Sequence, residues 1–237
     1  MAKRKPNKMR PASITQFATA AAGSVVIEMG KTKVLCTASI ASEVPRWLRG
    51  KDGNPPSKGW VTAEYNMMPG STPDRKRRGT DGRSSEIQRL IARVLRAAVD
   101  LEKMPGLMIT CDCDVLMADG GTRTASITGA FVALSQAIAK ALDKGLIEKN
   151  PIIGPAAAIS VGMIDGVATL DLDYPLDVRA DVDMNVAMIH KGQFVEIQGT
   201  GEGGTFTRKE SDQMLDLATA GIKKLIALQK KTLKSLR

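Results

Sequence analysis

Hydrophobic and polar residues alternate along several short stretches of the chain, which is the pattern of half-buried β-strands. The clearest stretch is 107–115, where Leu107 and every second residue after it is apolar or cysteine. Other β-rich stretches predict roughly seven further strands. They are the two strands of a hairpin over 23–39 and single strands at 60–65, 156–163, 167–173, 182–188 and 193–198.

Three longer segments repeat their apolar residues every three or four positions, as amphipathic helices do. The first covers 83–98, and either Asp81 or Ser84 is placed to cap it. The second covers 126–142 and is apolar over most of its length. The third opens at 207–210 with a Thr and a Glu in capping-box spacing.

Each half of the chain therefore runs through strands into a long helix. This order predicts an α+β fold of mixed sheets with packed helices, in which a β-α unit is duplicated. A length of 237 residues is enough to bury a substantial core, and we expect one compact domain spanning 1–237. Aromatic residues make up only 3%, so the core must be built from aliphatic side chains and methionine.

The stretch Asp119–Ser126, with the sequence DGGTRTAS, joins the strand at 107–115 to the second helix. Its two glycines permit a tight turn that exposes backbone amides, and Gly121 and Thr122 stand at a helix start, where partial positive charge collects. Arg123 adds a full charge with a fork geometry that suits phosphate oxygens. The stretch thus indicates a cradle for an anion, although an ordinary Gly-rich turn before a capped helix has the same local features.

The net charge of +9 is concentrated in a few segments. Residues 1–12 hold five basic side chains and 221–237 hold six, and without these the chain has 23 bases against 25 acids. We expect flexible basic tails at 1–12 and 223–237. The loop at 69–82 contains a further basic run, Arg75, Lys76, Arg77 and Arg78. Such runs favour contacts with a polyanion, and solvated tails that only aid solubility are the alternative.

Three cysteines, Cys36, Cys111 and Cys113, lie inside predicted strands. Their odd number and the lack of a CxxC pair favour buried reduced thiols over a disulfide framework or a zinc site. No uninterrupted apolar run reaches the roughly 18 residues of a membrane span, and no apolar segment follows the basic start. We therefore expect a cytoplasmic protein with no membrane association.

Four acids, Asp173, Asp177, Asp181 and Asp183, cluster before and at the start of a predicted strand. Carboxylate oxygens of this kind suit Mg²⁺, which keeps several waters and contacts substrate phosphates. A solvated acidic turn is the alternative. The only histidine, His190, is predicted to lie in a surface turn, and no Walker A loop is present. What remains is chemistry based on bound phosphate, arginine and a metal ion.

Several blocks of the chain resemble the ribonuclease PH family, and they occur in that family's order over roughly 9–222. The longest is DCDVLMADGGTRTASITG at 112–129, which contains the cradle. The others are KVLCTA at 33–38, GWVTAEY at 59–65, GRSSEIQRLI at 82–91, LDLDY at 170–174, ADVDMN at 180–185 and EIQGTGEG at 196–203. Several blocks in register make the resemblance specific, whereas any one alone would be weak.

The resemblance implies the ribonuclease PH-like fold, which is also described as ribosomal protein S5 domain 2-like. It implies a phosphorolytic 3′→5′ exoribonuclease, also described as a tRNA nucleotidyltransferase. Inorganic phosphate attacks the terminal phosphodiester of RNA, such as a tRNA 3′ end, and releases nucleoside 5′-diphosphates. It further implies a homo-oligomeric ring, typically a hexamer built as a trimer of dimers.

The resemblance also assigns roles to individual residues. Arg83, Gly121, Thr122 and Arg123 match the phosphate-binding positions. Asp177 and Asp183 match the catalytic acidic pair, which holds Mg²⁺ or Mn²⁺ or assists proton delivery to the leaving 3′-oxygen.

The sequence departs from the family where RNA is expected to enter. Gly70 stands where most members have arginine, the loop is several residues shorter, and the usual Asp-Gly-Arg near the start is absent. Arg75, Lys76, Arg77 and Arg78 are expected to bind RNA instead, by phosphate contacts that read no sequence. The alternatives to an active enzyme are an inert RNA-binding ring subunit and an unrelated phosphate-dependent transferase on the same fold.

Overall fold

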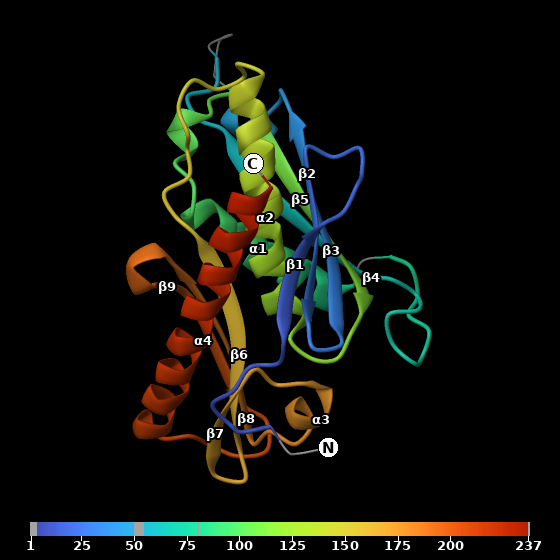
Figure 1. Ribbon diagram of the computed structural model, residues 1–237, viewed down its shortest axis with the longest axis vertical. Coiled ribbons are helices and arrows are strands. Elements are labelled where there is room, and N and C mark those ends of the chain that lie inside the picture. Colours follow the sequence, from blue (N-terminus) through green and yellow to red (C-terminus); the bar gives the residue numbers. More distant parts are fainter. Residues whose placement is uncertain (1–3, 50–54, 80, 237) are drawn as a thin grey trace.

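The computed structural model describes residues 4–49, 55–79 and 81–236 and contains two β-sheets (Figure 1). The first sheet has five strands in the order β1-β2-β3-β5-β4. Its strands are β1 (Ala12–Gln16), β2 (Gly23–Met29), β3 (Thr32–Ala41), β4 (Trp60–Met67) and β5 (Met108–Met117). All neighbours are antiparallel except β4 and β5, which are parallel. The sheet is mixed, as predicted.

The second sheet has four antiparallel strands in the order β7-β6-β8-β9. Its strands are β6 (Ala156–Ile164), β7 (Val167–Leu170), β8 (Val182–Ile189) and β9 (Gln193–Gly201). The predicted hairpins at 23–39 and 156–173 are both present, although β7 ends three residues before the predicted boundary. The chain between β7 and β8 forms a turn and the short helix α3 (Tyr174–Asp177) instead.

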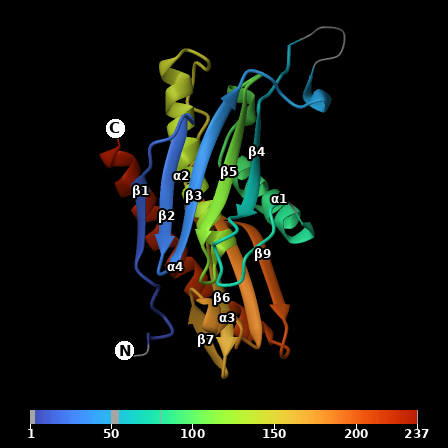
Figure 2. The same ribbon diagram turned by 90° about the vertical axis from the view of Figure 1, so that its right-hand side faces the viewer.

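Three long helices pack on these sheets. They are α1 (Gly82–Ala97), α2 (Thr122–Asp143) and α4 (Arg208–Ser235), and short 3-10 turns lie at Arg46–Leu48, Leu101–Lys103 and His190–Gly192. Both predicted caps form, with Asp81 accepting from the Ser84 amide at α1 and Thr207 and Glu210 forming the capping box of α4. Figure 2 shows α1 and α2 behind one face of the first sheet.

Helix α2 lies at the centre of the core, in contact with β2, β3, β5 and β6. Its length and composition would suffice for a membrane span, but 78% of its apolar window is buried inside the protein. No uninterrupted apolar run of this length stands in the sequence, because small and hydroxyl residues interrupt the apolar ones without making the helix polar. Cys36, Cys111 and Cys113 are free and buried around it, as expected.

Both terminal segments differ from the prediction of flexible tails. Helix α4 continues through the basic C-terminal segment to Ser235, because the side chain of Gln229 is fully buried and donates to the carbonyls of Thr128 and Ala156 at 2.9 and 2.7 Å. At the other end, Arg10 is 7% exposed and leads into β1, a strand that the sequence pattern did not reveal. Residues 1–3 and 237 lie outside the described part.

Candidate active site

The cradle turn (Asp119–Gly121) has the geometry that its glycines predict. Gly120 and Gly121 have φ of 75° and 67°, the left-handed region that glycine tolerates, and α2 begins directly after them. Among the described residues, no side chain caps the first amides of this 22-residue helix. The helix N-terminus therefore keeps N–H donors and a partial positive charge for an anion.

Two side chains of the first turn of α2 are held by neighbouring strands. The hydroxyls of Thr122 and Tyr65 of β4 lie 2.8 Å apart. Arg123 donates from Nη1 to Oε1 of Gln198 on β9 at 2.6 Å and lies 3.6 Å from Oε1 of Glu86 on α1. Arg123 is thus oriented from both sides before any ligand arrives.

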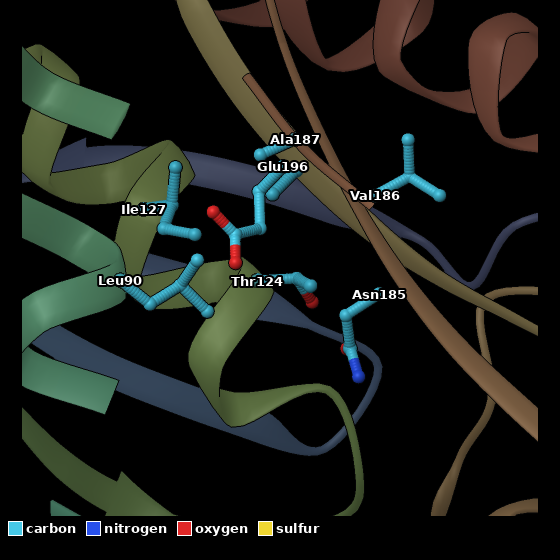
Figure 3. A pocket seen from close by; sticks show the side chains of 8 residues that line it. Leu90, Thr124, Ile127, Asn185, Val186, Ala187 and Glu196 are labelled. Carbon is cyan, nitrogen blue, oxygen red and sulfur yellow. The ribbon is translucent and has the colours of Figure 1, made fainter. Parts of the chain in front are cut away.

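Figure 3 shows how Glu196, two residues before Gln198 on β9, is packed between α1 and α2. Glu196 of β9 lies against Leu90 of α1 and against Thr124 and Ile127 of α2. It also pairs with Arg93 of α1. Because residues two apart on a strand point to the same side, this packing also directs Gln198 toward Arg123.

Arg83 is the second residue of α1, directly after the capped N-terminus, and its side chain is exposed. Burial raises the pKa of Tyr65, and the charges of Arg83 and Arg123 oppose that shift. The two arginines therefore act on the same small region around Tyr65.

The acidic pair comes from two elements of the second half of the chain. Asp177 is the last residue of α3, and Asp183 lies on β8 between Gly162 of β6 and Thr200 of β9. Partial desolvation raises the pKa of Asp177, opposed by the charge of Arg83. Desolvation also raises the pKa of Asp183, and the charge of Asp177 adds to the rise. The carboxylates thus lie close enough to each other and to the arginines to interact electrostatically.

The other two members of the predicted acidic cluster do not share this position. Asp173 caps α3 by accepting from the Leu176 amide at 3.2 Å, and Arg4 lies 3.7 Å from it. Asp181 is exposed and precedes β8. Glu202, which sequence reasoning did not single out, contributes instead, because its charge raises the pKa of both Asp177 and Asp183.

The acidic pair fits a divalent cation that keeps most of its waters. Within 4–49, 55–79 and 81–236, no group of three or more His, Cys, Asp or Glu is arranged to hold a metal by itself. Oδ1 of Asp183 is buried and has no hydrogen-bond partner among the described residues. Such an oxygen favours a bound cation, and Mg²⁺ often takes only one or two carboxylates from the protein.

The loop expected to bind RNA begins beside the cradle. The Ala118 amide, one residue before Asp119, donates to the carbonyl of Ser71 at 2.8 Å. Beyond this anchor, residues 75–78 are exposed. Four cationic side chains are thus presented to solvent on a loop whose base touches the cradle.

Comparison with known proteins identifies the family. Family models described as "3′ exoribonuclease family, domain 1" and "domain 2" match residues 8–139 and 154–221. Ribonuclease PH of Corynebacterium efficiens is 52% identical over 236 residues, which is 97% of this chain and 94% of that protein. The chain belongs to the ribonuclease PH family. This confirms the resemblance and the enzyme class, a 3′ exoribonuclease.

Other relatives agree with this assignment. Ribonuclease PH of Corynebacterium glutamicum is 51% identical over 97% of this chain and 94% of that protein. The crystal structure of rice Rrp46 has the same fold, with a TM-score of 0.77 at 20% identity over 98% of both chains. An Archaeoglobus fulgidus exosome with RNA bound to the active site matches with a TM-score of 0.79 at 22% identity over 94% of this chain and 89% of that one. The predicted α+β fold is therefore that of the ribonuclease PH family.

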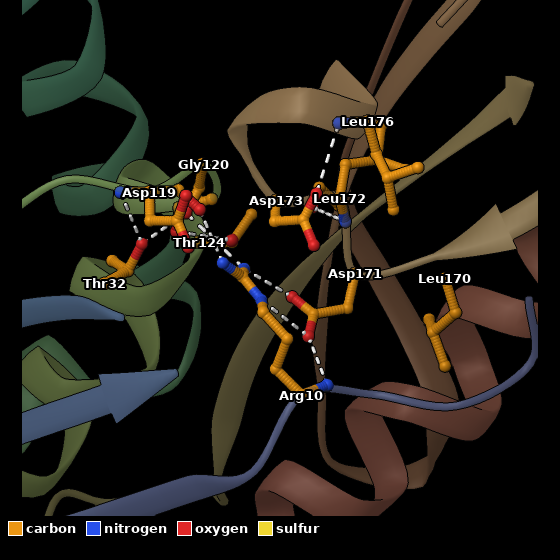
Figure 4. Close-up of polar contacts among 12 residues, drawn as sticks. Arg10, Thr32, Asp119, Gly120, Thr124, Leu170, Asp171, Leu172, Asp173 and Leu176 are labelled. Carbon is orange, nitrogen blue, oxygen red and sulfur yellow. Dashed lines mark hydrogen bonds and ion pairs between the residues drawn. The ribbon is translucent and has the colours of Figure 1, made fainter. Parts of the chain in front are cut away.

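Sequence reasoning missed a buried ion pair beneath the cradle. Arg10 and Asp171 are 7% and 1% exposed, and Nη2 of Arg10 lies 2.7 Å from Oδ1 of Asp171 (Figure 4). Arg10 lies in the segment expected to be a tail. Asp171 stands out in the sequence only as part of the LDLDY block. Since 161 residues separate the partners, no local pattern links them.

Proposed function

We propose that this protein is a phosphorolytic 3′→5′ exoribonuclease that trims the 3′ ends of RNA such as tRNA precursors. Inorganic phosphate is the co-substrate, and nucleoside 5′-diphosphates are released. The reverse reaction adds nucleotides. The observation that carries the proposal is the uncapped start of α2, with Arg83 and Arg123 on the same region as the acids Asp177 and Asp183.

The cradle holds the attacking phosphate in this proposal. The amides of Gly121 and Thr122 donate to its oxygens, and the start of α2 stabilises its negative charge. Arg83 and Arg123 offset the charge that spreads over the transferring phosphoryl group, so positioning and electrostatics dominate the catalysis. Gln198 keeps the guanidinium of Arg123 in place, which reduces the ordering required at each turnover.

Asp177 and Asp183 act on the leaving 3′-oxygen. Mg²⁺ or Mn²⁺, when bound by the two carboxylates, supplies positive charge to the phosphoryl oxygens. The alternative role is proton delivery: without a bound cation, the raised pKa of each carboxyl favours holding a proton that can pass to the oxygen of the shortened RNA. Both roles need the carboxylates beside the scissile bond, on the side away from the attacking phosphate.

Arg75, Lys76, Arg77 and Arg78 guide the RNA strand toward the cradle through phosphate contacts. These contacts carry no sequence information, which suits an enzyme that removes successive nucleotides.

We also propose a homo-oligomeric ring, a hexamer of three dimers, as the resemblance implies. We propose that the protein acts in the cytoplasm, where its three free cysteines would stay reduced. Native mass measurement tests the ring.

The test is a degradation assay on RNA with a free 3′-OH and Mg²⁺, with and without phosphate. Release of nucleoside diphosphates only in the presence of phosphate supports the proposal. Loss of the full charge-assisted contact in Arg123→Ala is expected to cost about 1.5–3 kcal/mol, or roughly 10- to 150-fold in phosphate affinity. Arg208→Ala is the matched control, because Arg208 is an exposed arginine at the start of α4 whose only acidic partner among the described residues is Asp212.

Two outcomes would contradict the proposal. RNA that is bound but not degraded at any phosphate concentration would indicate an inert RNA-binding subunit. Release of nucleoside monophosphates without phosphate would indicate a hydrolase, since water would then be the nucleophile.

A further inference from the structure

We infer that Arg10 is a positioning residue for phosphate, acting through the peptide groups of the cradle turn; this rests on the proposed function. Arg10 lies in the N-terminal segment, 109 residues before the cradle. Nη1 donates to the carbonyl of Asp119 at 2.6 Å, and Nη2 donates to the carbonyl of Gly120 at 3.4 Å. Figure 4 shows this guanidinium between the cradle and the chain that leads to α3.

The other contacts of Arg10 fix it in place. Its backbone amide and its Nε both donate to Oδ2 of Asp171, at 2.7 and 3.0 Å, and Nη2 donates to Oδ1 at 2.7 Å. Asp171 is anchored in turn, because its amide donates to the carbonyl of Ser160 on β6 at 2.7 Å. The four-stranded sheet thereby fixes the position of the guanidinium that holds the cradle.

Thr32 of β3 holds the same turn from the first sheet. Its hydroxyl donates to the carbonyl of Gly120 at 2.6 Å and accepts from the amide of Asp119 at 3.0 Å. Thr32 is fully buried, so these bonds face no competition from water. The cradle turn is therefore clamped between the two sheets by Arg10 and Thr32.

This clamp decides where the cradle amides point. In a trans peptide the carbonyl oxygen and the following N–H lie on opposite sides of the bond, and no cis peptide occurs in the described residues. Holding the carbonyls of Asp119 and Gly120 toward Arg10 and Thr32 turns the N–H groups of Gly120 and Gly121 away from them. The Gly121 N–H is one of the two amides that the proposed function assigns to phosphate, so the clamp fixes the direction of that donor.

Arg10 acts by geometry more than by its own charge. Asp171 pairs with Arg10 inside the protein and offsets its positive charge. The fork of the guanidinium is the essential feature, because it bonds a carboxylate and two carbonyls at once. A lysine at this position retains the charge for Asp171 but cannot make all of these bonds.

The test compares Arg10→Lys with Arg4→Lys in phosphate titrations of RNA degradation. Arg4 is the matched control, because it donates to the carbonyls of Leu170 and Asp171 at 2.8 and 2.7 Å, and none of its described hydrogen bonds reaches residues 119–121. Arg10→Lys is expected to raise the KM for phosphate roughly tenfold or more, since misplacement by about 1 Å can cost up to a hundredfold. The KM for RNA should stay unchanged.

A second pair of variants keeps the inference testable if Arg10→Lys does not fold. Thr32→Val removes the hydroxyl at nearly constant volume and should raise the KM for phosphate. Thr32→Ser keeps the hydroxyl, so its KM for phosphate should be close to that of the wild type. A phosphate KM that is equal in the wild type, Arg10→Lys and Thr32→Val would overturn the inference. A wild type that needs no phosphate would instead refute the proposed function.

Discussion

Gly120→Ala probes the closest contact between the cradle and the segment that carries Asp177. Gly120 has φ of 75°, and an added Cβ would lie 2.6 Å from the carbonyl oxygen of Leu172, 2.7 Å from the carbonyl carbon of Asp173 and 2.8 Å from the amide nitrogen of Tyr174. All of these are backbone atoms. They cannot move by a change of rotamer, so the turn and α3 must separate.

The magnitude follows from two separate costs. A left-handed backbone costs a residue with a Cβ about 1–2 kcal/mol relative to glycine. Overpacking against fixed atoms adds about 1–3 kcal/mol. Gly106→Ala isolates the first cost, because Gly106 has φ of 74° and an added Cβ there meets nothing within 4 Å. We therefore expect Gly120→Ala to be less stable than Gly106→Ala by about 1–3 kcal/mol.

The assay combines urea unfolding with phosphate titration of both variants. Unfolding midpoints at unchanged slope report the stability difference. Activity should fall much further in Gly120→Ala, because a shift of about 1 Å between the cradle and Asp177 can cost about a hundredfold. Equal stability of the two alanine variants would refute the close contact at Gly120. Equal activity would refute the inference that this contact sets the distance between the cradle and Asp177.

Three further results are expected. Replacing Arg75, Lys76, Arg77 and Arg78 with serine should flatten the salt dependence of RNA binding by about 0.7 in log–log slope for each RNA phosphate that the loop no longer neutralises; an unchanged slope would move RNA binding to other basic segments. Asp183→Asn should abolish activity yet unfold at a higher temperature than the wild type at neutral pH. The folded pKa of Asp183 is raised, so ionisation of Asp183 removes stability from the wild type as pH rises through that pKa. The difference in unfolding temperature between the variant and the wild type should shrink as pH falls toward the ordinary aspartate pKa of about 3.9, and a constant difference would contradict this. Gln229→Met should remove the two hydrogen bonds from the Gln229 amide to the carbonyls of Thr128 and Ala156 and cost about 1–3 kcal/mol in urea unfolding; an unchanged midpoint would mean that the amide contributes nothing.

Much of the site was predictable, because local chemistry and family resemblance pointed to the same residues. Gly121, Thr122 and Arg123 follow one another in the chain, so their grouping needs no tertiary information. Their geometry at a helix start follows from the glycines and the apolar pattern after them. Which of Asp173, Asp177, Asp181 and Asp183 share one position was decided by folding, since α3 turns Asp173 into a cap.

The ends of the chain show the limit of composition. The lysines of 223–234 lie on the outer face of a helix whose inner face buries Gln229 and Thr232. Counting charges detects the first face and misses the second. A glutamine whose side-chain NH₂ group donates to two carbonyls of other elements looks polar in the sequence and is fully buried in the structure.

The sequence by itself determined most of the strands, the long helices, their caps, the glycine turn before α2 and the family, because periodicity, turn chemistry and contiguous motifs are local properties. Only the tertiary structure decided how the cradle is held. Arg10, Thr32 and Asp171 come from three distant parts of the chain, and their polar groups are buried where each requires a partner. Such partners are brought together by the packing of both sheets around α2, which no local stretch of sequence encodes.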